Sequence, residues 1–240
     1  MTSQNPPHVG FIDPGGGNSP HFAPFVAMLP DGIRLDIDGL GLMRDSLEQL
    51  VDVEDEAFRR AMAIVEAHPD WQAAALLAAP VVLGNPGLLA RLREAVRIPL
   101  TTAMEASALA AERLGTRRVL LLTPFREELN TQIREYLAGL GLATVSPDRT
   151  FDSYRDAQAL GSDPVYGLAK EQLEKAGEVD GIYFQGAVLD PLLIVDRLEA
   201  DFGLPVIASN LAMLWHVASL AGGKTPVGGY GRLLREWPAL

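Results

Sequence analysis

An internal repeat is the feature that most constrains how this chain can fold. Residues 179–190 contain a short apolar run flanked by glycines, residues 191–203 have helical spacing and end at a glycine, and residues 204–210 begin another apolar strand. The same order occurs in residues 71–105: an apolar run with a strand over 73–79, a helical stretch to position 97 and a second strand. Short apolar runs of this kind are typical of strands that are covered on both faces in a parallel sheet.

Two further matches extend the repeat. The helical residues 106–115 correspond to residues 211–222, and the strand and proline of residues 8–14 correspond to residues 118–124. Matched elements in the same order predict two copies of one α/β unit.

The repeat predicts an α/β fold with two pseudo-symmetric lobes and an active-site cleft between them. Each lobe is expected to be a mostly parallel four-stranded sheet flanked by helices. We expect the first lobe to contain residues 1–103 and 211–240, and the second to contain residues 104–210. Residues 151–164 are polar and contain glycine, and they are the longest predicted loop.

Composition excludes several functions. The 240 residues include no cysteine, so disulfides, thiolate metal sites and cysteine nucleophiles are ruled out. A net charge of -11 gives no general attraction to nucleic acid or to anionic membranes. No apolar run is long enough to span a bilayer, and the polar start lacks the features of a signal peptide. We therefore expect a cytoplasmic protein with no nucleic-acid partner and no membrane partner.

The first candidate site is the glycine-rich loop of residues 13–20. Ligands of open α/β sheets bind at the carboxyl ends of strands, and this loop follows the first predicted strand. Gly16 and Asn18 are predicted to contact a carboxylate or phosphate, with Asp13 as the base. The alternative is a glycine-rich turn in which Asp13 accepts N–H bonds from its own loop. The loop matches neither the dinucleotide-binding pattern nor the P-loop pattern.

The second candidate site follows the strand of the other copy. Gln185, Gly186 and Ala187 are predicted to present backbone N–H groups to an anion or a carbonyl oxygen. Glu105 is a second catalytic candidate, although a carboxylate in the first turn of a helix also suits the helix dipole. His216 lies in an apolar helical stretch and is interpreted as a core or interface residue. No residues have metal-ligand spacing, so no metal is expected.

Several segments resemble the aspartate/glutamate racemase superfamily, within it the branch of arylmalonate decarboxylase and maleate isomerase. The resemblance covers nearly the whole chain and is carried by the segments VGFI (9–12), IPLTT (98–102), LGTRRVLLLTPF (114–125) with Asn130, DGI (180–182), GLPVIASN (203–210), LAGG (220–223) and GYGRL (229–233).

The resemblance implies two lobes with a site between them, and proton transfer at a carbon next to a carboxylate by two facing cysteines. It places those cysteines at about Ala79 and at Gly186, so both are missing here. Small hydroxyl residues of the decarboxylase branch correspond to Pro80 and Val81, and a tyrosine after Thr-Pro corresponds to Phe125. These three residues and Asn130 are expected to contact the substrate.

We therefore expect a cysteine-independent lyase or isomerase that uses acid/base proton transfer on a small carboxylated or carbonyl compound, with no cofactor. The alternative is a non-catalytic ligand-binding or regulatory protein on the same scaffold. A homo-oligomer could form through the apolar helix 211–220, although burial of this helix inside a lobe is equally consistent with its composition.

Overall fold

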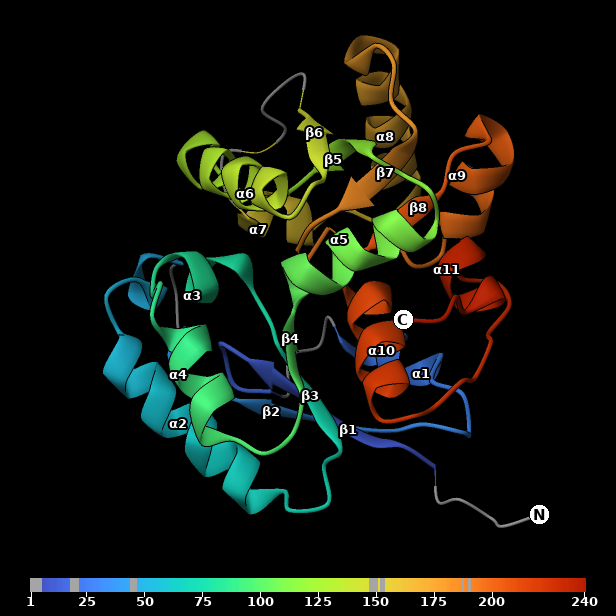
Figure 1. The fold of residues 1–240 in the computed structure, drawn as a ribbon. Coiled ribbons are helices and arrows are strands. Elements are labelled where there is room, and N and C mark those ends of the chain that lie inside the picture. Colours follow the sequence, from blue (N-terminus) through green and yellow to red (C-terminus); the bar gives the residue numbers. More distant parts are fainter. Residues whose placement is uncertain are drawn as a thin grey trace, which may run out of the picture. The chain divides into compact units, whose positions relative to one another are not determined.

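The computed structural model describes residues 6–17, 22–43, 47–146, 151, 154–186, 188–189 and 191–240 (Figure 1). The chain divides into two compact units. Unit 1 comprises residues 1–102 and 216–225, and unit 2 comprises residues 103–215 and 226–240.

The sheet of unit 1 has four parallel strands in the order β2-β1-β3-β4. The strands are β1 (His8–Asp13), β2 (Arg34–Gly39), β3 (Ala73–Leu76) and β4 (Leu100–Thr102). All residues of β1 and β3 are buried, as expected for inner strands that are covered on both faces. Strand β2 lies at the edge, and its polar residues are partly exposed.

Short helices connect the strands of unit 1. They are α1 (Ala23–Ala27), the 3-10 helix η2 (Leu47–Leu50), α2 (Glu54–Ala67), α3 (Ala79–Leu83) and α4 (Leu88–Ala95). Helices α2 and α4 pack against each other (Figure 1). Helix α2 begins with three acidic residues, which suit the positive end of the helix dipole.

Unit 2 repeats the same sheet with the order β6-β5-β7-β8, again all parallel. Its strands are β5 (Arg118–Leu122), β6 (Ala143–Val145), β7 (Gly181–Phe184) and β8 (Val206–Ala208). Its helices are α5 (Ala103–Arg113), α6 (Glu127–Gly139), α7 (Tyr154–Gln158), α8 (Ser162–Ala176), α9 (Val195–Phe202), α11 (Gly231–Glu236) and the first part of α10 (Ser209–Leu220). The prediction of two four-stranded parallel sheets flanked by helices is confirmed.

Of the C-terminal segment, residues 216–225 belong to unit 1 and residues 226–240, which include α11, belong to unit 2. The first turn of α11 is held by carboxylates of α9. Gly231 N–H donates to Asp196 Oδ1 at 2.7 Å, and Arg232 N–H donates to Glu199 Oε2 at 2.8 Å. Carboxylates at a helix N-terminus are favourable because they accept its unpaired N–H groups.

Two local expectations need correction. The third strand ends at Leu76 instead of residue 79, because the chain turns at Ala78 into α3. The predicted loop 151–164 contains helix α7 and the start of α8, where Pro164 is tolerated in the first helical turn. From Leu211 to Ala218, every residue of α10 except His216 is at most 1% exposed, which agrees with the burial alternative for this helix.

Candidate active site

The carboxyl group of Asp13 is the only titratable side chain of the predicted loop that the structure describes, and it is buried at the end of β1. Its side-chain Oδ2 accepts N–H bonds from Gly15 at 2.9 Å and from Gly17 at 3.4 Å. The residue is 6% exposed. Burial raises the pKa of Asp13, and the two N–H bonds offset only part of that rise. The turn-acceptor interpretation therefore holds, and the same carboxyl group retains its proton at higher pH than an ordinary aspartate.

The glycine loop is fixed by the chain that follows β2. Leu40 N–H donates to Asp13 O, and Gly41 N–H donates to Gly15 O, both at 2.7 Å. A Cβ on Gly39 would lie 2.4 Å from Gly15 O, so only glycine allows this contact. Gly17 has a φ of 75°, in the region that favours glycine.

Gly16 is exposed, and a Cβ added to it would meet no atom within 4 Å. The loop thus leaves open space at the position that we predicted to contact a ligand. Asn18, the other predicted contact, lies outside the described residues, as does His21.

The turn after β3 has a strained backbone. Ala78 has a φ of 68° and a ψ of 115°, a conformation that residues with a Cβ rarely adopt. Because β1 and β3 pair in parallel, their carboxyl ends lie side by side. Pro80 and Val81 lie in the following helix α3 and are buried, so they contribute apolar packing after β3.

In unit 2, the loop after β5 is braced by two polar side chains. Thr123 Oγ1 donates to Asn130 Oδ1 and accepts the N–H of Phe125 at 3.2 Å. Asn130 Nδ2 donates to Phe125 O at 3.0 Å. The amide of Asn130 thus shapes the loop that carries Phe125, whose ring is buried.

The end of β7 carries a second internal polar network. The fully buried Tyr183 donates its hydroxyl to Gln185 Oε1. Burial raises the pKa of Tyr183, so this hydroxyl stays protonated as a donor. Gly186 has a φ of 108°, and its N–H points to Ser209 Oγ at 3.4 Å. Ala187 and Asp190 lie outside the described residues.

Glu105 lies in the first turn of α5 and is partly buried. This position matches the helix-dipole interpretation, and Glu105 belongs to unit 2 whereas Asp13 belongs to unit 1.

Sequence reasoning missed two features of these strand ends. Tyr183 has a usable signal, because residues two apart on a strand face the same side and Tyr183 therefore lies beside Gln185. The strained backbone of Ala78 has no sequence signal, since alanine is ordinary in helices and turns alike.

Metal-binding clusters and membrane-spanning helices are both lacking in the part of the chain that the structure describes. No set of three or more His, Asp or Glu side chains there is arranged to hold a metal ion. No helix there is long and apolar enough to cross a membrane.

Each unit carries an all-parallel sheet in which the strands have the order second, first, third, fourth, and polar side chains lie at the strand ends. This repeated arrangement defines a two-lobe α/β protein. The chain belongs to the arylmalonate decarboxylase family, whose sequence model matches residues 9–234.

Individual relatives agree with this assignment. The chain is 30% identical to arylmalonate decarboxylase of Bordetella bronchiseptica over 154 residues, which is 63% of this chain and 64% of that protein. A liganded structure of an arylmalonate decarboxylase variant, with a glycine replaced by cysteine and a cysteine by serine, superposes with a TM-score of 0.81 and 26% identity. That superposition covers 96% of this chain and 99% of the other.

A third relative shows the fold alone. A variant of the maleate cis-trans isomerase of Nocardia farcinica contains a covalently bound succinylcysteine intermediate. It has a TM-score of 0.76 and 19% identity, covering 96% of this chain and 98% of that one. Cysteine is thus a reacting residue in that isomerase, whereas the present chain has none.

Proposed function

We propose that this protein is a lyase or isomerase that moves a proton at carbon in a small carboxylated or carbonyl compound without a cysteine. The observation that carries the proposal is the buried carboxyl group of Asp13 at the end of β1, with its raised pKa. General acids and bases work best when their pKa is moved toward the working pH. The family assignment and the names of the relatives, which include a decarboxylase and an isomerase, support this reaction class.

Asp13 is the proposed acid/base group. In a decarboxylation, the C–C bond to one carboxylate breaks, CO2 leaves and the electron pair stays on the neighbouring carbon. The protonated Asp13 then gives its proton to that carbon and is reprotonated from water. In an isomerisation by proton transfer, the Asp13 carboxylate takes the proton from carbon and returns it.

Other strand-end residues have proposed supporting roles. The backbone at Gly16 and at Gly186 is proposed to contact the substrate, and Glu105 is the proposed second acid/base group. Because Asn130 and Gln185 use their side chains for internal hydrogen bonds, we propose that they set the shape of the loops that contact the substrate. Phe125, Pro80 and Val81 are proposed to supply apolar surface.

The test is exchange of carbon-bound hydrogen in D2O, followed by proton NMR. The panel contains phenylmalonate, malonate, maleate, a 2-hydroxy acid and aspartate, and CO2 release is measured in parallel. We expect at least one compound to exchange or be converted. Asp13→Asn should lower that rate by roughly 100-fold or more, the usual contribution of a general acid or base. Asp31→Asn, which changes an exposed aspartate of the same unit, should leave the rate unchanged.

Two outcomes would contradict the proposal. Unchanged turnover in Asp13→Asn would remove this residue from the mechanism. A rise in melting temperature with these compounds, without exchange or conversion, would favour a ligand-binding protein, because a ligand that prefers the folded state stabilises it by mass action.

A further inference from the structure

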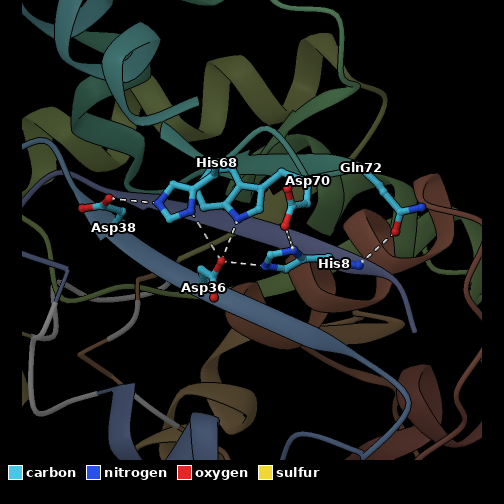
Figure 2. Close-up of polar contacts among 7 residues, drawn as sticks. His8, Asp36, Asp38, His68, Asp70 and Gln72 are labelled. Carbon is cyan, nitrogen blue, oxygen red and sulfur yellow. Dashed lines mark hydrogen bonds and ion pairs between the residues drawn. The ribbon is translucent and has the colours of Figure 1, made fainter. Parts of the chain in front are cut away.

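A polar cluster lies on one face of the unit 1 sheet, centred on the edge strand β2 (Figure 2). Asp36 Oδ2 accepts the indole Nε1–H of Trp71 at 3.0 Å and lies 2.6 Å from His8 Nε2. Burial opposes ionisation of Asp36, but the hydrogen bonds from Trp71 and His8 and the neighbouring imidazoles outweigh it, so the pKa of Asp36 is lowered. Asp36 is therefore a carboxylate that holds three segments of the chain together.

His68 extends this cluster along β2. Its Nδ1 lies 3.6 Å from Asp36 Oδ2, and its Nε2 lies 3.2 Å from Asp38 Oδ2 (Figure 2). The imidazole stacks on the indole of Trp71, with ring centroids 4.3 Å apart. Side chains from the C-terminal end of α2 and from the segment before β3 thus hold a strand that has a paired neighbour, β1, on one side only.

The end of the fastened strand supports the glycine loop. Asp38 Oδ1 accepts the N–H of Gly39 at 2.7 Å. Gly39 is the residue that packs against the backbone of the glycine loop, and the next residue, Leu40, donates its N–H to Asp13 O. A continuous set of contacts therefore runs from His68 through Asp38 to Asp13.

We propose that Asp36 and Asp38 are positioning residues for Asp13, because they hold the end of β2 on which the Asp13 loop rests. When β2 is held, Gly15 and Gly17 keep their N–H groups on Asp13 Oδ2. When it is released, these N–H bonds lengthen, and the charged form of Asp13 loses stabilisation. The catalytic role of Asp13 in this inference rests on the proposed function. The effect of β2 on the Asp13 loop does not depend on that function.

The experiment uses NMR on the full chain without any substrate. Amide hydrogen exchange is measured at Gly15 and Gly17, and the Asp13 carboxyl carbon is titrated. In Asp38→Ala we expect exchange at both amides to be faster by on the order of tenfold, comparable to losing one hydrogen bond to a charged group. The titration midpoint of Asp13 should move upward.

Three further variants make the result specific. Asp38→Asn keeps an acceptor for Gly39 N–H and should restore most of the protection. Trp71→Phe keeps an aromatic ring but removes the donor to Asp36, and it should act in the same direction as Asp38→Ala even if that variant folds poorly. Asp70→Asn changes a mostly exposed carboxylate 4.0 Å from His8 Nδ1 and should leave Asp13 unaffected.

An unchanged Asp13 titration in both Asp38→Ala and Trp71→Phe, with stability alone reduced, would overturn the inference and leave the cluster a structural one. An equal upward shift in Asp70→Asn would also overturn it, because the effect would then not depend on the contacts of β2, and loss of a negative charge alone lowers the pKa of a nearby carboxyl group. Neither result would touch the proposed function, which is judged by the turnover of Asp13→Asn.

Discussion

Thr101 Oγ1 lies 2.9 Å from His216 Nδ1, and this contact joins the last strand of unit 1 to helix α10 across 115 positions of sequence. Burial, and after it the charge of Arg93, lowers the pKa of His216 from its ordinary value of 6.5 to about 4. The folded protein therefore holds this imidazole neutral through the weakly acidic range. A neutral histidine inside a helix is consistent with the core interpretation of His216.

The first prediction concerns acid stability. Between pH 6.5 and about 4 the unfolded chain binds a proton at His216 that the folded chain does not, so the free energy of unfolding falls as the pH drops. A pKa shift of this size corresponds to a loss of at most about 3 kcal/mol in the free energy of unfolding. His216→Gln should flatten the decline in urea midpoint measured from pH 7 to pH 4.5. Parallel curves for the variant and the wild type would show that His216 does not carry this dependence.

The second prediction separates stability from activity at Asp13. Because its folded pKa is raised, the folded state binds more protons than the unfolded state just above the ordinary pKa of 3.8, and stability is lost as the pH rises through that window. Asp13→Asn removes the loss of stability that comes from ionising the buried carboxyl group, and the side-chain carbonyl of the asparagine can still accept the N–H of Gly15. The variant should be at least as stable as the wild type in urea at pH 7 although inactive. A clearly less stable variant would mean that the charge itself holds the loop.

The third prediction concerns the close approach of Trp71 to β1. A Cβ added to Gly10 would lie 2.2 Å from the indole ring, so Gly10→Ala must displace the ring that donates to Asp36. Overpacking of a buried site costs about 1–3 kcal/mol, and we expect the upper part of this range. Gly16→Ala is the matched control, because it has open space and should change stability by less than ~0.5 kcal/mol. Equal urea midpoints for the two variants would contradict the contact.

The fourth prediction concerns the strained turn after β3. Ala78→Gly relieves a φ of 68° and should stabilise the protein by about 1 kcal/mol, since the strain relief exceeds the entropy cost of glycine. Ala79→Gly, one position later in helix α3, should instead destabilise by about 1 kcal/mol. Thermal unfolding of both variants checks this sign difference, and destabilisation by both would show that Ala78 is not strained.

Several features were predictable because they follow from local patterns. Apolar runs such as residues 182–184 identify inner strands, and their repetition with a helix between them predicts a duplicated parallel sheet. The position of Asp13 at a strand end also follows, because Val9 to Ile12 is the apolar run that precedes it. The complete lack of cysteine by itself excludes a cysteine nucleophile.

Other features depend on contacts between distant segments, which local periodicity does not contain. Helix α11 contacts α9 through Asp196 and Glu199, which accept the N–H groups of Gly231 and Arg232. Val81 is buried by packing in α3, and Gln185 is buried and accepts the hydroxyl of Tyr183. Strand order and loop contacts decide such burial, and the sequence pattern gives only the ends of each strand.

Residue type and spacing are enough to predict the duplicated α/β architecture and the absence of a thiol nucleophile. The protonation behaviour of Asp13 and His216, the backbone of Ala78 and the attachment of β2 to the glycine loop depend on tertiary contacts. A pKa depends on how far water is excluded and on which N–H groups point at the carboxyl oxygen. These quantities exist only once segments far apart in the chain have come together.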